Sequence, residues 1–338
     1  EGEHPAATQP FPTLPVPFTR QQFLQDDLRS FMDDRDSLRR LMQNAKTGSP
    51  YLPITDKMTI FFPGTDGGAQ WGGAASDPDG ILFIPAKEVP VYTTLKPVTA
   101  KKIGADSARG ANEKLYTLRC ASCHGEDLKG NHDGSIPPLA DLALKMDQKS
   151  AAQVTINGRG MMPGFSHISE QERAAILGFL FKKKSTQTSP QTAVAVVPYH
   201  NTGYNRWYHQ GYPVSSPPWG TLSALNLNTG QLQWQVPLGE YEELTAKGIP
   251  VTGTDNYGGP VVTAGGLIFI AATRDQKIRA FEKSSGRLLW QHDLPAAGYA
   301  TPSTYMVDGR QYIVIACGGG KLNTKSGDQY VAFALPAK

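Results

Sequence analysis

The feature that most constrains the fold of this chain is an internal repeat with a fixed offset. The segment SALNLNTGQLQW at 223–234 is similar to IRAFEKSSGRLLW at 278–290. The matched positions are all 56 residues apart: Ala224 and Ala280, Leu225 and Phe281, Gly230 and Gly286, Leu232 and Leu288, Trp234 and Trp290. Each copy has a glycine between two apolar runs and ends in tryptophan. The pattern predicts two antiparallel strands joined by a tight turn.

A second repeat adds two more strands. The segment WGGAASDPDGILFI at 71–84 is similar to YGGPVVTAGGLIFI at 257–270, and 301–315 is a weaker copy. Together the repeats predict a unit of four strands, the size of one β-propeller blade.

The predicted blades are not contiguous. One spans 257–292 and another begins near 300, but the first begins near 66 and is completed only at 219–238. The residues between its halves form an insertion, which a blade tolerates because its sheet holds both ends. We therefore predict a mainly β chain: a partial β-propeller of about three four-stranded blades, with an all-α domain inserted within a blade.

The insertion contains the sequence CASCH at 120–124. Cys-x-x-Cys-His is the attachment pattern of haem c, in which the thiols of Cys120 and Cys123 add to the two vinyl groups and His124 binds the iron. Met162, directly before a proline, is predicted as the second axial ligand, and Met161 is assigned to packing. Histidine and methionine ligation suits an electron carrier, because the thioether favours reduced iron.

Helical patterns surround this motif. One helix is predicted over 107–120, and another over 169–183 with Ser169 as its N-cap and Glu172 completing a capping box. Bacteria install haem c outside the cytoplasmic membrane, so we expect a periplasmic or otherwise exported protein.

Three other interpretations of the cysteine pair are weaker. A structural zinc ion needs four ligands, and the chain has only one further cysteine, Cys317. A redox dithiol needs a βαβ context, which the pattern lacks. A pair of inert cysteines would leave Met162 and its proline as a coincidence. Cys317 ends an apolar run and is predicted to be a buried core residue.

Composition excludes further classes of protein. The chain has 338 residues and a net charge of +3, which gives no reason to expect a nucleic-acid partner. It has no apolar run of about eighteen residues, so no transmembrane helix is expected.

Residues 1–18 look like a linker rather than a signal peptide. One or two helices are predicted within 19–46, with an apolar face of Phe23, Leu24, Leu28, Phe31 and Met32.

The predicted organisation has four parts. Residues 1–62 are a linker and helices that pack on the propeller, 63–99 the first half of a blade, 100–187 the cytochrome domain, and 188–338 the remainder of that blade with two further blades. A linker at 184–198 leads back from the cytochrome. The aromatic run at 198–213 either lines a sugar site or forms a packed loop. His200 and His209 are assigned no role.

Several stretches resemble one family of enzymes. The tryptophan repeat, TQPFPTLPVPF (8–18), PPWGTLSALNLNTG (217–230) and ATPSTYMVDGRQYIVIACGGGK (300–321) look like the C-terminal part of glucose, quinate and sorbosone-type dehydrogenases that use pyrroloquinoline quinone (PQQ). Residues 100–187 resemble a class I cytochrome c. The resemblance implies oxidation of a sugar or alcohol by PQQ beside a calcium ion, with electrons leaving through haem c.

The resemblance also implies roles for single residues. In class I cytochromes a proline carbonyl orients the axial histidine; Pro137 is the nearest match, and Pro138 competes with it. The residues that motif position places near the quinone are Trp71, Trp219, Asn256 and Tyr257. Packing within the blades is the alternative for the two tryptophans among them. Trp234 and Trp290 are assigned to docking between blades.

The chain departs from the family in two respects. Family propellers have about eight blades, so we expect another chain or an N-terminal segment to carry the missing blades, the acidic base and the PQQ-contacting lysine. Relatives often have an asparagine near the quinone where this chain has Pro85.

The first hypothesis is a quinohaemoprotein dehydrogenase. The alternative is an electron-transfer cytochrome on a propeller scaffold that no longer binds PQQ, and a third is an interaction propeller with an inert haem.

Overall fold

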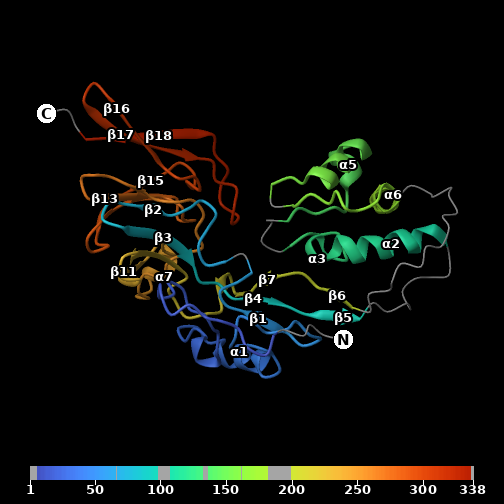
Figure 1. Ribbon diagram of the computed structural model, residues 1–338. Coiled ribbons are helices and arrows are strands. Elements are labelled where there is room, and N and C mark those ends of the chain that lie inside the picture. The colour runs from blue at the N-terminus through green and yellow to red at the C-terminus, as the bar shows by residue number, and fades with distance from the viewer. Residues whose placement is uncertain are drawn as a thin grey trace. The chain divides into compact units, whose positions relative to one another are not determined.

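The computed structural model in Figure 1 describes residues 6–65, 67–97, 107–131, 136–160, 162–181 and 199–335. The chain forms two compact units. The first consists of Glu1–Pro53, Met58–Tyr92 and Arg206–Lys338, and the second of Ile54–Lys57 and Thr93–Asn205. The range predicted for the cytochrome, 100–187, lies inside the second unit, and the predicted linker at 184–198 lies outside the described residues.

The first four-stranded sheet is assembled from two distant parts of the sequence. Its order is β11-β10-β3-β2, with β2 at Ala75–Ser76, β3 at Ile81–Lys87, β10 at Gly220–Asn226 and β11 at Gln231–Pro237. Strands β3 and β10 are antiparallel neighbours, with Gly220 opposite Lys87 and Asn226 opposite Ile81. The strands expected at 71–84 and 219–238 therefore belong to one sheet, although the second unit lies between them in the sequence.

The second four-stranded sheet has the order β12-β13-β14-β15, with strands at Val261–Val262, Leu267–Ile270, Lys277–Glu282 and Leu288–Asp293. It shares a local irregularity with the first sheet. The pairing register shifts between Ala224 and Leu225 in one and between Ala280 and Phe281 in the other. These are matched positions of the sequence repeat, so the repeat encodes a β-bulge as well as the strands.

The third sheet corrects the expectation of four strands. Among the described residues it has three, in the order β16-β17-β18, at Ser303–Val307, Arg310–Cys317 and Gln329–Ala334. The weak repeat copy supplies β16 and β17. The glycine-rich stretch after Cys317 has positive φ at Gly319 and Gly320 and forms a loop rather than a strand.

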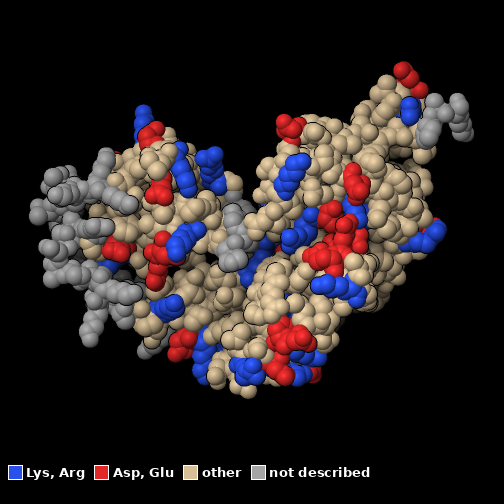
Figure 2. Space-filling view, turned by 180° about the vertical axis from the view of Figure 1, so that it is seen from behind, with Lys and Arg blue, Asp and Glu red and all other residues tan. Residues whose placement is uncertain are grey.

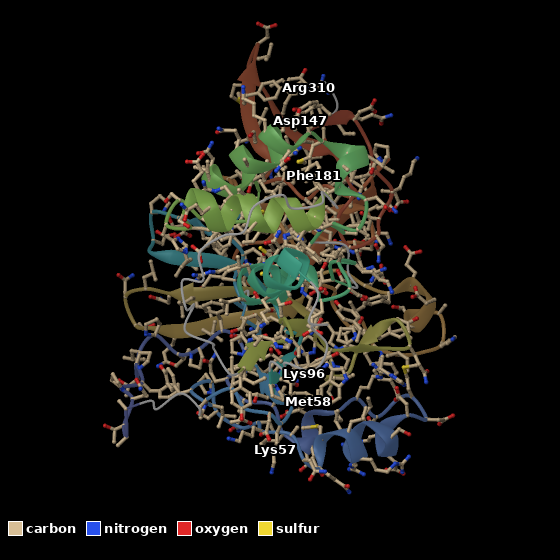
Figure 3. The ribbon with its side chains drawn as sticks, turned by 90° about the vertical axis from the view of Figure 1, so that its right-hand side faces the viewer. Lys57, Met58, Lys96, Asp147, Phe181 and Arg310 are labelled. Atoms are coloured by element: carbon tan, nitrogen blue, oxygen red, sulfur yellow. The ribbon has the colours of Figure 1, made fainter. Side chains whose placement is uncertain are left out.

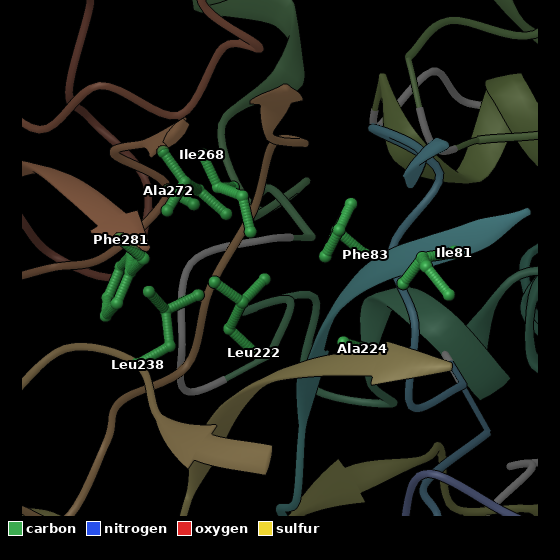
Figure 4. Packing of buried hydrophobic residues seen from close by; sticks show 9 residues of the cluster. Ile81, Phe83, Leu222, Ala224, Leu238, Ile268, Ala272 and Phe281 are labelled. Carbon is green, nitrogen blue, oxygen red and sulfur yellow. The ribbon is translucent and has the colours of Figure 1, made fainter. Parts of the chain in front are cut away.

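The tryptophan that ends each repeat packs between sheets, as expected. Figure 4 shows apolar side chains from the first and second sheets in one buried cluster, against which Trp234 packs. The Trp234 indole N–H donates to the Lys283 carbonyl at 3.0 Å. Trp290 lies edge-on to Phe333 of β18, with ring centroids 5.2 Å apart. Each tryptophan thus contacts the sheet that follows its own.

The prediction of helices throughout residues 19–46 is wrong in part. The structure has a 3₁₀ turn at Gln25–Asp27 and one helix, α1, at Arg35–Met42. Leu28 instead pairs with Ser215, and the buried Arg29 guanidinium donates to the Pro213 carbonyl at 2.6 Å and contacts Asp34. These tertiary hydrogen bonds hold the backbone extended, and they override the helical spacing of the apolar residues.

Short strands complete the fold. A three-stranded sheet has the order β1-β4-β7, at Thr59–Phe61, Val91–Thr93 and Asn205–Arg206. Strands β8 at Tyr208–His209 and β9 at Tyr212–Pro213 form a hairpin, and a short helix, α7, spans Glu242–Thr245. None of the helices in the described ranges is long and apolar enough to cross a bilayer.

The second unit is helical. Its helices are α2 at Ser107–Arg119, α3 at Ala121–His124, α4 at Leu142–Lys145, α5 at Gln148–Asn157 and α6 at Glu170–Leu180. Helix α6 starts with the predicted capping box of Ser169 and Glu172. Figure 3 labels Asp147, which caps α5, and Lys96 on β5 (Leu95–Pro97). Strand β5 pairs with β6 (Tyr199–Asn201), so the two ends of the helical segment are held together.

Candidate functional site

The haem-attachment motif lies where helix α2 gives way to the single turn α3. The Cys120 N–H donates to the Tyr116 carbonyl at 2.8 Å, and the His124 N–H donates to the Cys120 carbonyl at 3.0 Å. One helical turn therefore separates the first thiol from the histidine. Cys123 is exposed and Cys120 half-buried, and both are free thiols. Burial raises the pKa of Cys120 to about 11, as does the neighbouring Cys123.

The tautomer of His124 follows from its partner. Its Nδ1 lies 3.0 Å from the Pro137 carbonyl oxygen. Because a carbonyl oxygen can only accept, Nδ1 carries the proton and Nε2 keeps its lone pair. The side chain is 7% exposed, and burial lowers the pKa of His124 although the Pro137 hydrogen bond opposes this. The imidazole is therefore neutral and oriented, as a metal ligand requires.

The same geometry distinguishes between the two prolines. The Pro138 carbonyl accepts from Lys145 Nζ at 3.3 Å instead. Tyr116 fixes the turn on the other side, because its hydroxyl donates to the Gly125 carbonyl at 2.7 Å. The contact that the resemblance implied for Pro137 is present, and its role toward haem is a prediction.

Met162 lies in a tight turn after helix α5, and Met161 lies outside the described residues. Its backbone exchanges two hydrogen bonds with Arg159, at 2.9 and 3.1 Å. Gly158 has a φ of +77°, and a methyl group added there would lie 2.5 Å from the Met162 carbonyl oxygen. The turn that carries the half-buried Met162 thus depends on glycine at 158.

In the first unit, matched glycines of the repeat bring two candidate quinone residues together. A Cβ on Gly72 would lie 2.6 Å from Gly258 Cα, so the two backbones are in direct contact. The Thr301 hydroxyl donates to the Gly72 carbonyl at 3.0 Å and accepts from Gly259 N–H at 2.9 Å. Trp71 and Tyr257, each directly before one of these glycines, are therefore positioned by backbone packing that only glycine permits.

Three cations gather on these aromatic residues. Lys321 Nζ lies 4.4 Å from the ring centroid of Tyr257 and 5.6 Å from that of Trp71. Lys87 Nζ lies 4.8 Å from the Tyr257 centroid, and Arg206 hydrogen-bonds to the Tyr257 hydroxyl. Burial lowers the pKa of Lys321, and the charges of Lys87 and Arg206 lower it further. We call these five residues the Tyr257 cluster.

The sequence did not reveal the three cations of the Tyr257 cluster. Lys87, Arg206 and Lys321 lie in separate parts of the chain, and no motif links them. The sequence indicated only the loop that carries Lys321, because the glycines of this loop follow an apolar strand. On the face in Figure 2, by contrast, basic and acidic side chains lie next to one another.

Two other candidate quinone residues are placed differently. Trp219 is fully buried, stacks on Tyr212 and donates its indole N–H to the Ser215 carbonyl at 2.7 Å. This environment supports blade packing for Trp219. Asn256 is also fully buried, and its amide donates to the Ala86 carbonyl at 2.7 Å while its Oδ1 has no partner among the described residues.

The remaining residues that the sequence singled out make contacts within the protein. Within the aromatic run, Trp207 is buried and Tyr208 donates to Asp255, whereas Tyr204 is exposed. His200 contacts Glu126. Cys317 is fully buried, as predicted, and burial raises its pKa. Within the described ranges, no group of three or more His, Cys, Asp or Glu could hold a metal ion.

Comparison with known proteins agrees with this architecture. Residues 1–126 and 147–313 match the PQQ family described as glucose/ethanol/alcohol dehydrogenase, β-propeller domain. The chain belongs to this family. Residues 108–180 match a second family, described as cytochrome c oxidase, cbb3-type, subunit III. The chain therefore combines a PQQ propeller domain with a cytochrome domain.

Relatives within the PQQ family are longer than this chain. It is 30% identical to the quinoprotein glucose dehydrogenase of Escherichia coli, over 99% of the chain and 34% of the relative. It is 39% identical to the quinate/shikimate dehydrogenase (quinone) of Acinetobacter baylyi, over 43% of the chain and 19% of the relative. The quinohemoprotein alcohol dehydrogenase structure from Comamonas testosteroni aligns with a TM-score of 0.40 at 17% identity, over 82% of this chain and 28% of that one. The chain thus spans about a third of the length of the E. coli protein and a smaller share of the other two.

Proposed function

We propose that this chain is the cytochrome-bearing part of a quinohaemoprotein dehydrogenase that oxidises a hydroxyl group of a sugar or alcohol and delivers the electrons to a covalently bound haem c. The observation that carries the proposal is His124, buried and neutral beside two free thiols in a chain of the PQQ propeller family. Its Nε2 lone pair is available because Nδ1 is engaged by Pro137.

The residues present fit a haem. The thiols of Cys120 and Cys123 would form the thioether bonds, and His124 Nε2 and the Met162 sulfur would bind the iron. A haem with histidine and methionine ligands takes up and releases one electron at a time at a raised potential. Pro137 would hold the His124 ring in place, and the Gly158 turn would hold Met162.

The Tyr257 cluster fits one side of a PQQ site. PQQ, a planar quinone with three carboxylate groups, supplies the acceptor for two electrons from the substrate hydroxyl. Trp71 is 83% exposed and offers an aromatic face. Gln70, directly before it, is buried and its Nε2 lacks a partner among the described residues, so it is available as a donor. A calcium ion beside the quinone would need ligands from the missing blades.

The proposal extends to the environment of the protein. The missing blades, with the acidic base and the PQQ-contacting lysine, would be supplied by another chain or an N-terminal segment. Covalent haem attachment requires export, so we place the protein in the periplasm or another exported location. A downstream acceptor would receive the electrons from the haem.

One observation favours a second candidate function. Pro85 lies within β3, paired with Leu222, and offers no side-chain amide where the family resemblance implies an asparagine. A chain that had lost PQQ in this way would serve as an electron-transfer cytochrome on a propeller scaffold.

The test is reduction of the haem by substrate. The complete protein, which includes the chain or segment that carries the missing blades, is loaded with PQQ and calcium under anaerobic conditions, and haem absorbance is followed after adding glucose, quinate, glycerol or ethanol. We expect at least one to reduce the haem. Reduction by chemical reductants but by no member of the panel would favour the electron-transfer alternative, and a chain without covalent haem would contradict both proposals.

A further inference from the structure

The third sheet is one strand short of the pattern that the other two sheets share. Ala332 of β18 matches Ala280 of β14 in the sequence repeat, and the residue after each is phenylalanine. In the second sheet, β14 is followed by β15, which ends that sheet. In the third sheet β18 is the last strand, and among the described residues it pairs only with β17. We call the outer edge of β18 (Gln329–Ala334) the open edge.

The matched alanines show what the open edge lacks. Ala224 lies directly opposite Trp234, and Ala280 lies directly opposite Trp290. Both alanines are buried in sheets that have a fourth strand, whereas Ala332 is exposed. Residues directly opposite each other in an antiparallel pair share a face, so a small side chain leaves room for a large ring on the neighbouring strand. The open edge therefore has the space for such a ring and, among the described residues, nothing that fills it.

Other apolar side chains beside the open edge are uncovered. Tyr330 is 80% exposed, although Ile278, its counterpart in β14, is fully buried. Trp290 is 38% exposed, whereas Trp234 rests against the turn between β14 and β15, where a Cβ on Gly286 would lie 2.5 Å from its ring. Exposed apolar side chains that lie together beside a strand edge mark a surface that another segment covers.

The sequence directly after β18 does not favour a hairpin that would supply the fourth strand. The turns that lead into β11 and β15 contain Gly230 and Gly286, with φ of +71° and +70°. Lys338 stands at the matched position, and a residue with a Cβ disfavours this left-handed conformation. The first sheet already combines strands from two distant parts of the sequence, and the chain spans 34% of its E. coli relative. A strand from elsewhere in the protein is therefore the better source.

We propose that the open edge binds an extended strand from the part of the protein that carries the missing blades. This strand runs antiparallel to β18, with an aromatic residue opposite Ala332 and an aliphatic residue opposite Phe333. The two complete sheets supply the pattern, because Leu232-x-Trp234 and Leu288-x-Trp290 face the matched residues of β10 and β14. Backbone hydrogen bonds to the open edge give affinity, and the alternate side chains give specificity. The inference rests on the proposed function only for the existence of the missing part.

The first test is photo-cross-linking in the complete protein, with Tyr330 replaced by benzoylphenylalanine. After irradiation and digestion, mass spectrometry identifies the linked peptide. We expect a peptide from the missing part that contains an aliphatic residue two positions before an aromatic one. The same replacement at Tyr51, an exposed tyrosine outside the third sheet, is the control and should not link that peptide. A link from position 330 to a second copy of this chain, or no link at all, would overturn the proposal.

Hydrogen exchange of the β18 amides gives a second test in the unaltered complete protein. A strand with one neighbour leaves alternate N–H groups free, whereas a strand with two neighbours pairs nearly all of them. We therefore expect consecutive amides of β18 to exchange at rates within about tenfold of each other. The amides of β15, the outer strand of the second sheet, should alternate between slow and fast exchange. The same alternation in β18 would show that its outer edge is free and would refute the proposal.

Haem reduction by substrate, measured on the same sample, separates this inference from the proposed function. Reduction together with alternating exchange in β18 would refute the strand at the open edge and leave the dehydrogenase proposal intact. Uniform protection of β18 and the expected cross-link, without reduction by any substrate of the panel, would support the strand and count against the dehydrogenase.

Discussion

Replacing Gly286 by alanine tests whether the repeat tryptophan docks one blade on the next. Gly286 has a φ of +70°, and an added Cβ would lie 2.5 Å from Trp234 Cε3. Two costs arise. Alanine in the left-handed region costs about 1–2 kcal/mol, and overpacking against a fixed ring costs about 1–3 kcal/mol more. We therefore expect Gly286→Ala to lower the free energy of unfolding by about 2–5 kcal/mol.

Gly266 provides a matched control in the same sheet. Its φ is +84°, but an added Cβ would meet nothing within 4 Å. Gly266→Ala should therefore incur only the backbone cost of about 1–2 kcal/mol. The difference between the two variants isolates the contact with Trp234.

Urea unfolding followed by tryptophan fluorescence measures these values. All five tryptophans lie in the first unit, so the signal reports on the propeller unit alone. In a Trp234→Ala background the difference between the two glycine variants should shrink to within about 0.5 kcal/mol. Equal destabilisation by Gly286→Ala and Gly266→Ala in the unaltered background would refute inter-blade docking by Trp234.

Three further predictions concern the cytochrome unit. Gly158→Ala should displace Met162 and lower the haem reduction potential in a redox titration, whereas Gly160→Ala, whose added Cβ meets nothing within 4 Å, should leave it nearly unchanged. Cys123→Ser should leave haem attached through a single thioether, which mass spectrometry of the denatured chain and the pyridine haemochrome spectrum would show; an unchanged spectrum contradicts the assignment. Partial burial would raise the pKa of Glu172, but hydrogen bonds from Arg119 and Ser169 outweigh it and lower the pKa below its ordinary 4.5. The charge therefore stabilises the fold above pH 4.5, and this stabilisation is lost as the pH falls through the folded-state pKa. Glu172→Gln should cost about 0.5 kcal/mol at pH 7 in thermal unfolding. The cost should shrink as the pH falls through that pKa, and a cost that does not change with pH would contradict the prediction.

Local patterns predicted much of the fold. The glycine and tryptophan repeat identified strands on both sides of the insertion, because strand and turn preferences depend on neighbouring residues. The capping box at Ser169 and the haem motif at Cys120–His124 are equally local. Where local preference met a tertiary contact, it failed: the apolar spacing around Leu28 predicted a helix, but Arg29 binds carbonyls from residues far along the chain.

The sequence by itself therefore determined the strand repeats, the haem-attachment motif and the capped helix predicted at 169–183. Each of these is set by residues a few positions apart. Only the tertiary structure decided which proline orients His124 and which cations surround Tyr257. The Pro137 carbonyl reaches His124 through a loop. Lys87, Arg206 and Lys321 converge near the place where the backbones of Gly72 and Gly258, in the loops before β2 and β12, touch each other. Contacts between distant segments depend on how whole sheets pack, and no local pattern records that packing.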